Sequence, residues 1–222
     1  MSQSAIRALV LDLDGTLIDS NDHHAEAWQK AFAHFGKVFD LEEVRMQIGK
    51  GGDYLVPDML SAREFRELGE PLRQYRSRLF RDLYRERVRP FPGVRESLER
   101  LRNEDLRLVL ASSSNQEDLD FFVRLLGIED LLDGRTTADD VDDPKPSPEV
   151  FSAALDLLKL DPEEALVVGD TPWDILAAHR SGLAIAAVRS GGFPPETLNR
   201  AELVIDDVRE LSARWKELHD SL

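Results

Sequence analysis

Two aspartates follow an apolar run near the start of the chain, and their spacing could serve catalysis. The segment reads LVLDLDGTLIDS over residues 9–20, and Asp12 and Asp14 would share one face of an extended chain. Two like charges on one face are unfavourable unless a cation or a proton offsets them. The pair therefore suggests nucleophilic or acid–base chemistry, although DxDG alone is also common in ordinary turns.

Further polar residues occur where other predicted strands end or in loops. They are Ser112 after LRLVLA, Lys145 within DDPKPSPEVF, and Asp170 and Asp174 after ALVVG. Each alone is explained by a helix cap, a turn or a proline-led helix start. Together they would meet at one edge of a parallel sheet, where carboxylates suit Mg²⁺ and a hydroxyl with a lysine suits an anion. A carboxylate nucleophile, a hard cation and a lysine are the components of phosphoryl transfer through an aspartyl-phosphate.

The elements that would position these residues alternate between short strands and helices. Besides the run before Asp12, apolar segments typical of buried strands occur at residues 106–111, 165–169, 183–188 and 201–205. Stretches of helical periodicity separate or follow them, at Val94–Arg102, Asp118–Leu126, Pro148–Leu158, Asp174–Ser181 and Val208–His219. This alternation predicts an α/β fold, a Rossmann-like parallel sheet with helices on both faces. Such sheets place their sites beyond the carboxyl ends of the strands.

Residues 20–89 interrupt the alternation. Three segments there, at residues 25–35, 41–48 and 71–88, are helical in period, with no convincing strand between them. We therefore expect an inserted α-helical domain, and a core domain made of residues 1–19 and 90–222. The glycine-rich stretch GKGGD (49–53) is predicted to be a loop that could reach a ligand.

The composition excludes several classes of function. The chain has 222 residues, 42% of them hydrophobic, and a formal net charge of −15, which disfavours binding to nucleic acid or to anionic membranes. It has no cysteine, so any metal must bind to oxygen or histidine ligands. No apolar run approaches the roughly 20 residues that span a bilayer, and no signal-peptide pattern opens the sequence, so we expect a cytoplasmic protein.

Four motifs in order, DLDGTL, ASSS, KPSP and GDTPWD, resemble those of the haloacid dehalogenase (HAD) superfamily. The similarity covers nearly the whole chain and is greatest to subfamily I, in which a helical cap follows the first strand. That subfamily includes phosphoglycolate phosphatase and β-phosphoglucomutase. The resemblance implies an Mg²⁺-dependent phosphatase that hydrolyses a small phosphorylated metabolite, with the helical insertion as its cap.

The resemblance also implies a role for each acidic motif residue. Asp12 would be the nucleophile, and Asp14 would be the general acid and then the general base. Mg²⁺ would bind to Asp12, to the backbone carbonyl of Asp14 and to Asp170. Asp174 would orient the metal's ligands or its bound water.

The remaining motif residues would contact the phosphoryl group. Ser112 and Lys145 would hold its oxygens, while Gly15 and Thr16 would shape a turn whose N–H groups face the phosphate. One departure from the family pattern is Pro144, which stands where many members have a glycine or another small residue. A proline there would stiffen the approach of Lys145.

Cap residues decide the substrate in this superfamily, and the candidates here are His24, Lys50, Arg73 and Arg76. The main rival to a phosphatase is a phosphomutase of the β-phosphoglucomutase type. In those enzymes a cap-loop arginine grips the second phosphate, whereas this chain has GKGGD, which favours a hydrolase.

Three further classes of protein fit the sequence less well. A phosphonatase needs a cap lysine, for which Lys37 and Lys50 are the nearby candidates, and a dehalogenase lacks the second aspartate of DxD. A receiver-type signalling module, which accepts a phosphoryl group on an aspartate, would be about half as long and would have no insertion. The sequence leaves the oligomeric state open.

Overall fold

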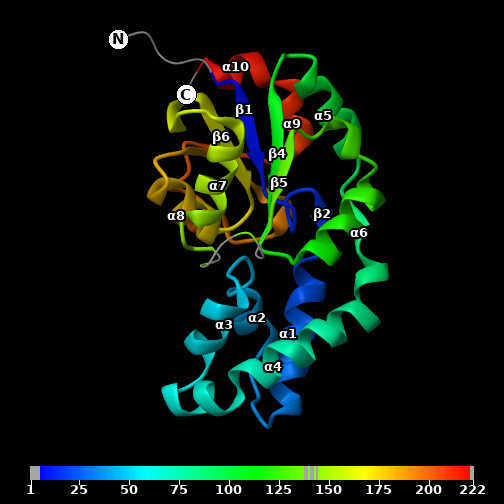
Figure 1. The fold of residues 1–222 in the computed structure, drawn as a ribbon, viewed down its shortest axis with the longest axis vertical. Helices are drawn as coiled ribbons and strands as arrows, with labels where there is room; N and C mark the ends of the chain where they lie inside the picture. Colours follow the sequence, from blue (N-terminus) through cyan, green and yellow to red (C-terminus); the bar gives the residue numbers. More distant parts are fainter. Residues whose placement is uncertain (1–5, 138–139, 141–142, 144, 221–222) are drawn as a thin grey trace.

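A six-stranded parallel sheet forms the centre of the molecule (Figure 1). The computed structural model describes residues 6–137, 140, 143 and 145–220. The strands lie in the order β5 (Gly134–Thr136), β4 (Arg107–Ala111), β1 (Ala8–Leu11), β6 (Ala165–Gly169), β7 (Ala184–Val188) and β8 (Leu203–Ile205). Leu9 pairs with Leu108 on one side and Leu166 on the other, so β1 is a central strand. The predicted fold class is confirmed.

Helices cover both faces of this sheet. Alternate residues of β1 point to opposite faces of the sheet. Leu9 and Leu11 pack against one set of helices, and Ala8 and Val10 pack against another. The first face carries α5 (Val94–Arg102), α6 (Gln116–Leu126), α9 (Val208–Ala213) and α10 (Trp215–His219). The second carries α7 (Glu149–Leu158) and α8 (Pro172–Arg180).

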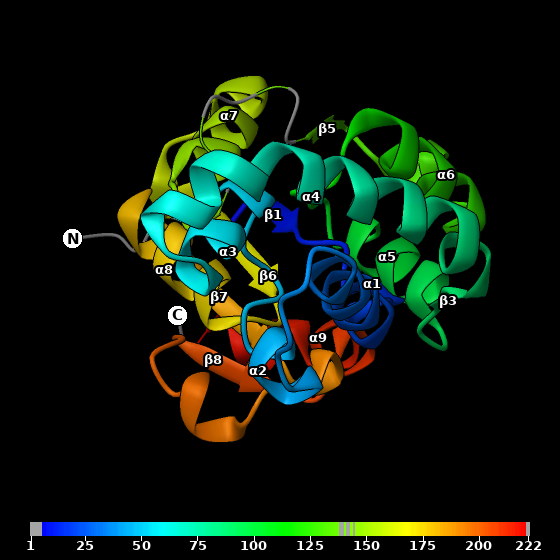
Figure 2. The same ribbon diagram turned by 90° about the horizontal axis from the view of Figure 1, so that it is seen from below.

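Four helices between β2 (Ile18–Asp19) and β3 (Arg89–Pro90) form a separate group at the end of the sheet where β1 finishes (Figures 1 and 2). They are α1 (Asn21–His34), α2 (Leu41–Arg45), α3 (Gly52–Met59) and α4 (Ala62–Leu83), called here the helical cap. The chain enters through β2 and returns through β3, which pair antiparallel. The boundaries at residues 20 and 89 stay a prediction.

Several elements differ in extent from the predicted ones. The long cap helix begins at Ala62 rather than Pro71, because Ser61 and Glu64 form a reciprocal capping box upstream of the expected start. Helix α3 was not predicted, and it begins inside the expected loop at Gly52. The last helix is two short ones that meet at Arg214. Short 3₁₀ helices occupy Arg85–Arg87, Glu129–Leu131, Pro162–Glu164, Arg189–Gly191 and Pro195–Thr197.

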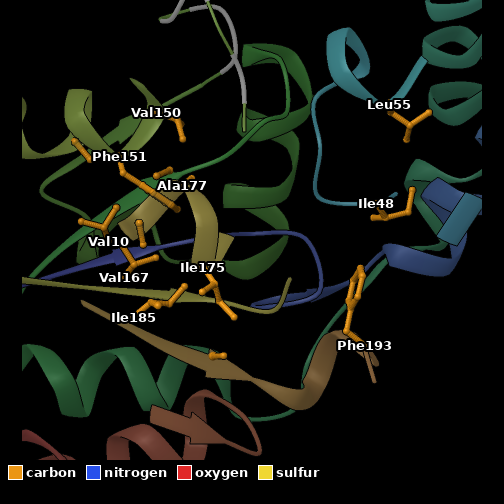
Figure 3. Close-up of a cluster of buried hydrophobic side chains, with 14 of the residues drawn as sticks. Val10, Ile48, Leu55, Val150, Phe151, Val167, Ile175, Ala177, Ile185 and Phe193 are labelled. Atoms are coloured by element: carbon orange, nitrogen blue, oxygen red, sulfur yellow. The ribbon is translucent and has the colours of Figure 1, made fainter. Parts of the chain in front are cut away.

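One apolar cluster runs from the sheet into the cap (Figure 3). Val10, Val167 and Ile185 belong to strands, while Ile48 and Leu55 come from the cap. Burial of a side chain of this size contributes about 1.5–3 kcal/mol, so the cluster stabilises the cap against the core. Among the described residues, no helix has both the length and the apolar character needed to cross a membrane.

Candidate active site

Three buried carboxylates meet at the carboxyl edge of the sheet. Asp12 directly follows β1 and Asp170 directly follows β6, while Asp174 lies in the first turn of α8. Their exposed fractions are 7%, 0% and 1%, and one oxygen of each lies within 4.8 Å of the others. Adjacent parallel strands therefore bring together residues that are far apart in the sequence.

Lys145 supplies a positive charge within this cluster. Its ammonium contacts Asp12 Oδ1 and lies 2.8 Å from Asp174 Oδ1, and the residue is 1% exposed. Burial lowers the pKa of Lys145, but the two carboxylates outweigh burial and leave this pKa above its usual value. Lys145 is therefore charged at every pH at which the protein would act.

One lysine does not neutralise three carboxylates. Burial raises the pKa of Asp12 to about 7, with Asp174 and Asp14 adding to the effect and Lys145 opposing it. Burial and the neighbouring charges of Asp12 and Asp174 likewise raise the pKa of Asp170 well above its usual value. A divalent cation would remove this repulsion between Asp12 and Asp170.

The surroundings of Asp170 are closely packed. Thr16 Oγ1 lies 3.2 Å from Asp170 Oδ1 and 3.3 Å from Asp12 Oδ2, and Asn21 Nδ2 donates to Asp170 Oδ2 at 2.7 Å. A Cβ on Gly15 would lie 2.2 Å from Asp170 Oδ2, and Gly15 has a φ of +76°. Only glycine fits this turn, both in conformation and in space.

The donor set fits Mg²⁺. Carboxylate oxygens are the ligands this cation prefers, and the cluster offers them in buried positions with an excess of negative charge. Asn21 Oδ1 is also buried and has no hydrogen-bond partner among the described residues. An unpaired buried acceptor is costly, and a water bound to a cation is a donor that would satisfy it.

Asp14 has different partners from Asp12. Its carboxylate accepts hydrogen bonds from Ser20 Oγ at 2.6 Å and Ser114 Oγ at 3.2 Å, and His24 Nε2 lies 2.8 Å away. Burial raises the pKa of Asp14, but His24 and the two hydroxyls outweigh burial and lower this pKa to about 2. Asp14 is thus ionised at neutral pH, whereas the pKa of Asp12 is held well above its usual value.

The cap reaches Asp14 through His24. Arg76 of α4 contacts His24 Nδ1, and a guanidinium can only donate, so Nδ1 accepts and the ring proton lies on Nε2, facing Asp14. Burial lowers the pKa of His24, and Arg76 adds to this effect while Asp14 opposes it. The ring also stacks on Phe80, with centroids 4.1 Å apart.

Ser112 is buried at the carboxyl end of β4. It is 1% exposed, and its hydroxyl oxygen accepts a hydrogen bond from the N–H of Ser114 at 3.0 Å. Ser114 in turn contacts Asp14, so the serine run of ASSS is linked to the second aspartate of DxD. Pro144, which departs from the family pattern, lies outside the described residues.

A cavity of about 220 Å³ opens between the cap and these carboxylates. Asp12 and Asp14 line it on the core side, together with Ser113, Ser114, Asn115 and Asp118. The cap contributes His24, Trp28, Ile48, the whole of residues 49–53, Arg73, Arg76 and Ser77. A cavity of this kind between two groups of elements is typical of a site for a small molecule.

Two of the cap candidates already have partners. The ammonium of Lys50 lies 2.5 Å from Asp58, 2.6 Å from Gln47 and 3.9 Å from the centre of the Trp173 ring. Arg73 pairs with Asp53 at 2.6 Å and with Glu70 at 2.8 Å. Both residues line the cavity, and their contact with a substrate stays a prediction.

Sequence reasoning missed three side chains that contact the carboxylates. Ser114 stands within the motif ASSS and Ser20 ends the quoted segment 9–20, so both lie in segments that the sequence already linked to the site. Asn21 is typical of the first residue of a helix, and no residue near it in the sequence indicates a contact with Asp170, which is 149 positions away.

Comparisons with known proteins agree with this geometry. Residues 9–188 match a family model described as haloacid dehalogenase-like hydrolase. A phosphoglycolate phosphatase from Chromobacterium violaceum is 31% identical over 216 residues, covering 95% of this chain and 97% of that protein. The solved structure of a hydrolase from Pseudomonas syringae has a TM-score of 0.88 at 28% identity, covering 96% and 99% of the two chains. A putative β-phosphoglucomutase from Bacteroides vulgatus has a TM-score of 0.86 at 26% identity, covering 100% and 92%. The chain belongs to the haloacid dehalogenase-like hydrolases, a family of enzymes.

Proposed function

We propose that this enzyme is an Mg²⁺-dependent phosphatase that hydrolyses a small phosphomonoester through an aspartyl-phosphate on Asp12. The observation that carries the proposal is the pair Asp12 and Asp14 on the wall of one small cavity, with different partners. Asp12 faces Lys145 and the other buried carboxylates, and Asp14 faces hydroxyls and His24. This division suits a nucleophile and a proton carrier.

In the first half-reaction, a carboxylate oxygen of Asp12 attacks phosphorus and the bond from phosphorus to the leaving oxygen breaks. Asp14 gives its proton to that oxygen, so an alcohol leaves. Asp14 is ionised before substrate binds, and the negative phosphate group arriving beside it raises its pKa so that it can carry this proton. Ser112 and Lys145 hold the phosphoryl oxygens.

In the second half-reaction, Asp14 takes a proton from water while the water oxygen attacks phosphorus. The acyl phosphate bond to Asp12 breaks, which releases inorganic phosphate and restores the carboxylate. Asp12, Asp170 and the carbonyl of Asp14 would hold Mg²⁺, with Asp174 orienting Lys145 beside them. When bound, the cation supplies positive charge that offsets the charge of the transferring phosphoryl group.

The test is phosphate release from a panel of sugar phosphates, phosphoglycolate and nucleoside monophosphates, with Mg²⁺ and with EDTA. We expect Mg²⁺-dependent release from at least one small member of the panel and none from Asp12→Asn. Full turnover in EDTA would overturn the metal assignment. Interconversion of sugar phosphate isomers in the presence of a sugar bisphosphate, without net phosphate release, would instead identify a mutase.

A further inference from the structure

The loop after β7 lies against the metal-binding end of the site, although no motif includes it. A Cβ on Gly191 would lie 1.7 Å from Asp170 Oδ2, so the backbone of this loop packs directly on that carboxylate. Ser190 Oγ donates to the carbonyl of Gly15 at 2.7 Å, which joins the same loop to the turn after Asp14. The loop therefore limits where the Asp170 side chain can lie.

Asn21 connects this loop to Asp170. Its Nδ2 donates to Asp170 Oδ2 at 2.7 Å and to the carbonyl of Gly191 at 3.1 Å. Asn21 is 3% exposed and is the first residue of cap helix α1. A change in the position of α1 would therefore move the hydrogen-bond donor that orients Asp170.

Arg45 holds the same carbonyl from a second cap helix, α2. Its Nη2 donates to the carbonyl of Gly191 at 2.7 Å, and its Nη1 donates to that of Gly192 at 3.2 Å. Its Nε donates to Asp22 Oδ1 at 2.7 Å, and the guanidinium lies 5.5 Å from the centre of the Phe193 ring. Figure 3 shows Phe193 extending from the core toward Ile48 of the cap, and both residues belong to the same buried apolar cluster.

We propose that Asn21 and Arg45 are positioning residues that together hold the Gly191 carbonyl and so make the orientation of Asp170 depend on the position of the cap. Asp170 is then fully aligned for a cation only when α1 and α2 are seated on the core. This inference rests on the metal site of the proposed function. It adds that residues of the cap, which do not touch the cation, determine how tightly the cation binds.

The experiment measures the dissociation constant of Mn²⁺, used as the probe for Mg²⁺, by electron paramagnetic resonance without substrate. We expect Asn21→Ala to weaken Mn²⁺ binding by about 10- to 100-fold, as loss of an outer partner of a ligand usually does. Arg45→Ala should weaken it by roughly 3- to 10-fold, a smaller loss because Arg45 acts through the carbonyl. Arg45→Lys should recover part of that loss, because a lysine can still donate to one carbonyl.

The matched control is Arg63→Ala, which removes an exposed cap arginine that pairs with Glu67 of its own helix. It should bind Mn²⁺ as the wild type does, and circular dichroism identifies any variant that has not folded. Wild-type affinity in both Asn21→Ala and Arg45→Ala overturns the inference. A loss confined to Asn21→Ala overturns the role given to Arg45 and α2. Absence of Mn²⁺ binding by the wild type would instead overturn the metal site itself, and with it the proposed function.

Discussion

At the scale of single residues, the two aspartates of DxD are distinguished by their neighbours. Asp12 contacts a charged lysine in a buried cluster of like charges, while Asp14 accepts hydrogen bonds from two serines and lies 2.8 Å from His24 Nε2. Two aspartate carboxyl groups are equivalent in water, but their neighbours make them different in this site. The Asp12 and Asp14 variants should therefore each block a different step of the reaction.

Asp12→Asn removes the nucleophile and a metal ligand, so we expect activity to fall by several orders of magnitude with no phosphoenzyme. Asp14→Asn keeps the backbone carbonyl and loses only proton transfer, which is worth about 10²- to 10⁴-fold. An aryl phosphate, whose leaving group needs little protonation, should still phosphorylate Asp12 in this variant, and hydrolysis of the adduct should be slow. Acid-quenched samples analysed by mass spectrometry should carry one phosphate on the peptide containing Asp12. An adduct on Asp170 would contradict the assigned roles.

The raised pKa of Asp12 predicts how stability depends on pH in EDTA. Its folded-state value of about 7 exceeds the usual 3.8, so the folded protein retains a proton that the unfolded chain releases. The contribution of Asp12 to stability is therefore complete below about pH 4 and is lost as the pH rises to about 7. We expect Asp12→Asn to unfold at a higher temperature than the wild type at about pH 8, with a much smaller difference at about pH 4. A difference that is equal at the two pH values would contradict this origin.

At the scale of elements, the loop of residues 49–51, just before α3, joins the cap to the core segments that carry the site. The N–H of Gly51 donates to the carbonyl of Lys145 at 3.1 Å, and Lys50 lies over Trp173. Gly49 has a φ of +96°, and a Cβ there would lie 2.7 Å from the side chain of Thr171. The loop can approach Lys145 only because this position has no side chain.

Gly49→Ala should therefore affect both stability and substrate binding. We expect it to lower the free energy of unfolding by about 2 kcal/mol and to raise KM, because the loop must move away from Thr171 and Lys145. Gly36→Ala is the control, since Gly36 has a similar backbone, with a φ of +73°, and open space around its Cβ position. That variant should lose stability without a change in KM. Equal effects of the two substitutions on KM would show that the contact with Thr171 is irrelevant.

The central strands and their polar ends were predictable because buried strands are short apolar runs and parallel strands end at one edge. The short strand β5 was not, since Gly134 and Arg135 have no apolar pattern. Pro71 suggested a helix start, although Ser61 and Glu64 provide a stronger one upstream. The contacts of Asn21 with Asp170 depend on the direction in which α1 leaves the sheet, which local sequence does not specify.

At the scale of the whole molecule, the buried excess of negative charge predicts that Mg²⁺ stabilises the folded chain. A ligand at about 100 times its dissociation constant adds about 2.7 kcal/mol to the free energy of unfolding. For a chain of this length, that amounts to a rise of roughly 5–10 °C in Tm. Thermal unfolding with Mg²⁺ and with EDTA measures the shift, and Asp170→Asn should abolish most of it. An identical Tm in the two conditions for the wild type would contradict a resident cation.

The central place of β1 in the sheet has a consequence for synthesis of the chain on the ribosome. Its partners are β4 and β6, with Ala8 paired to Arg107 and to Ala165, so the first strand to be made must wait for most of the chain. Until then, an apolar segment with unpaired backbone groups is exposed to other nascent chains. The helices of the cap are completed long before β6, and their local contacts can form meanwhile. Between the translation of Ala8 and that of Ala165, β1 therefore has at least one unpaired edge that a chaperone can cover.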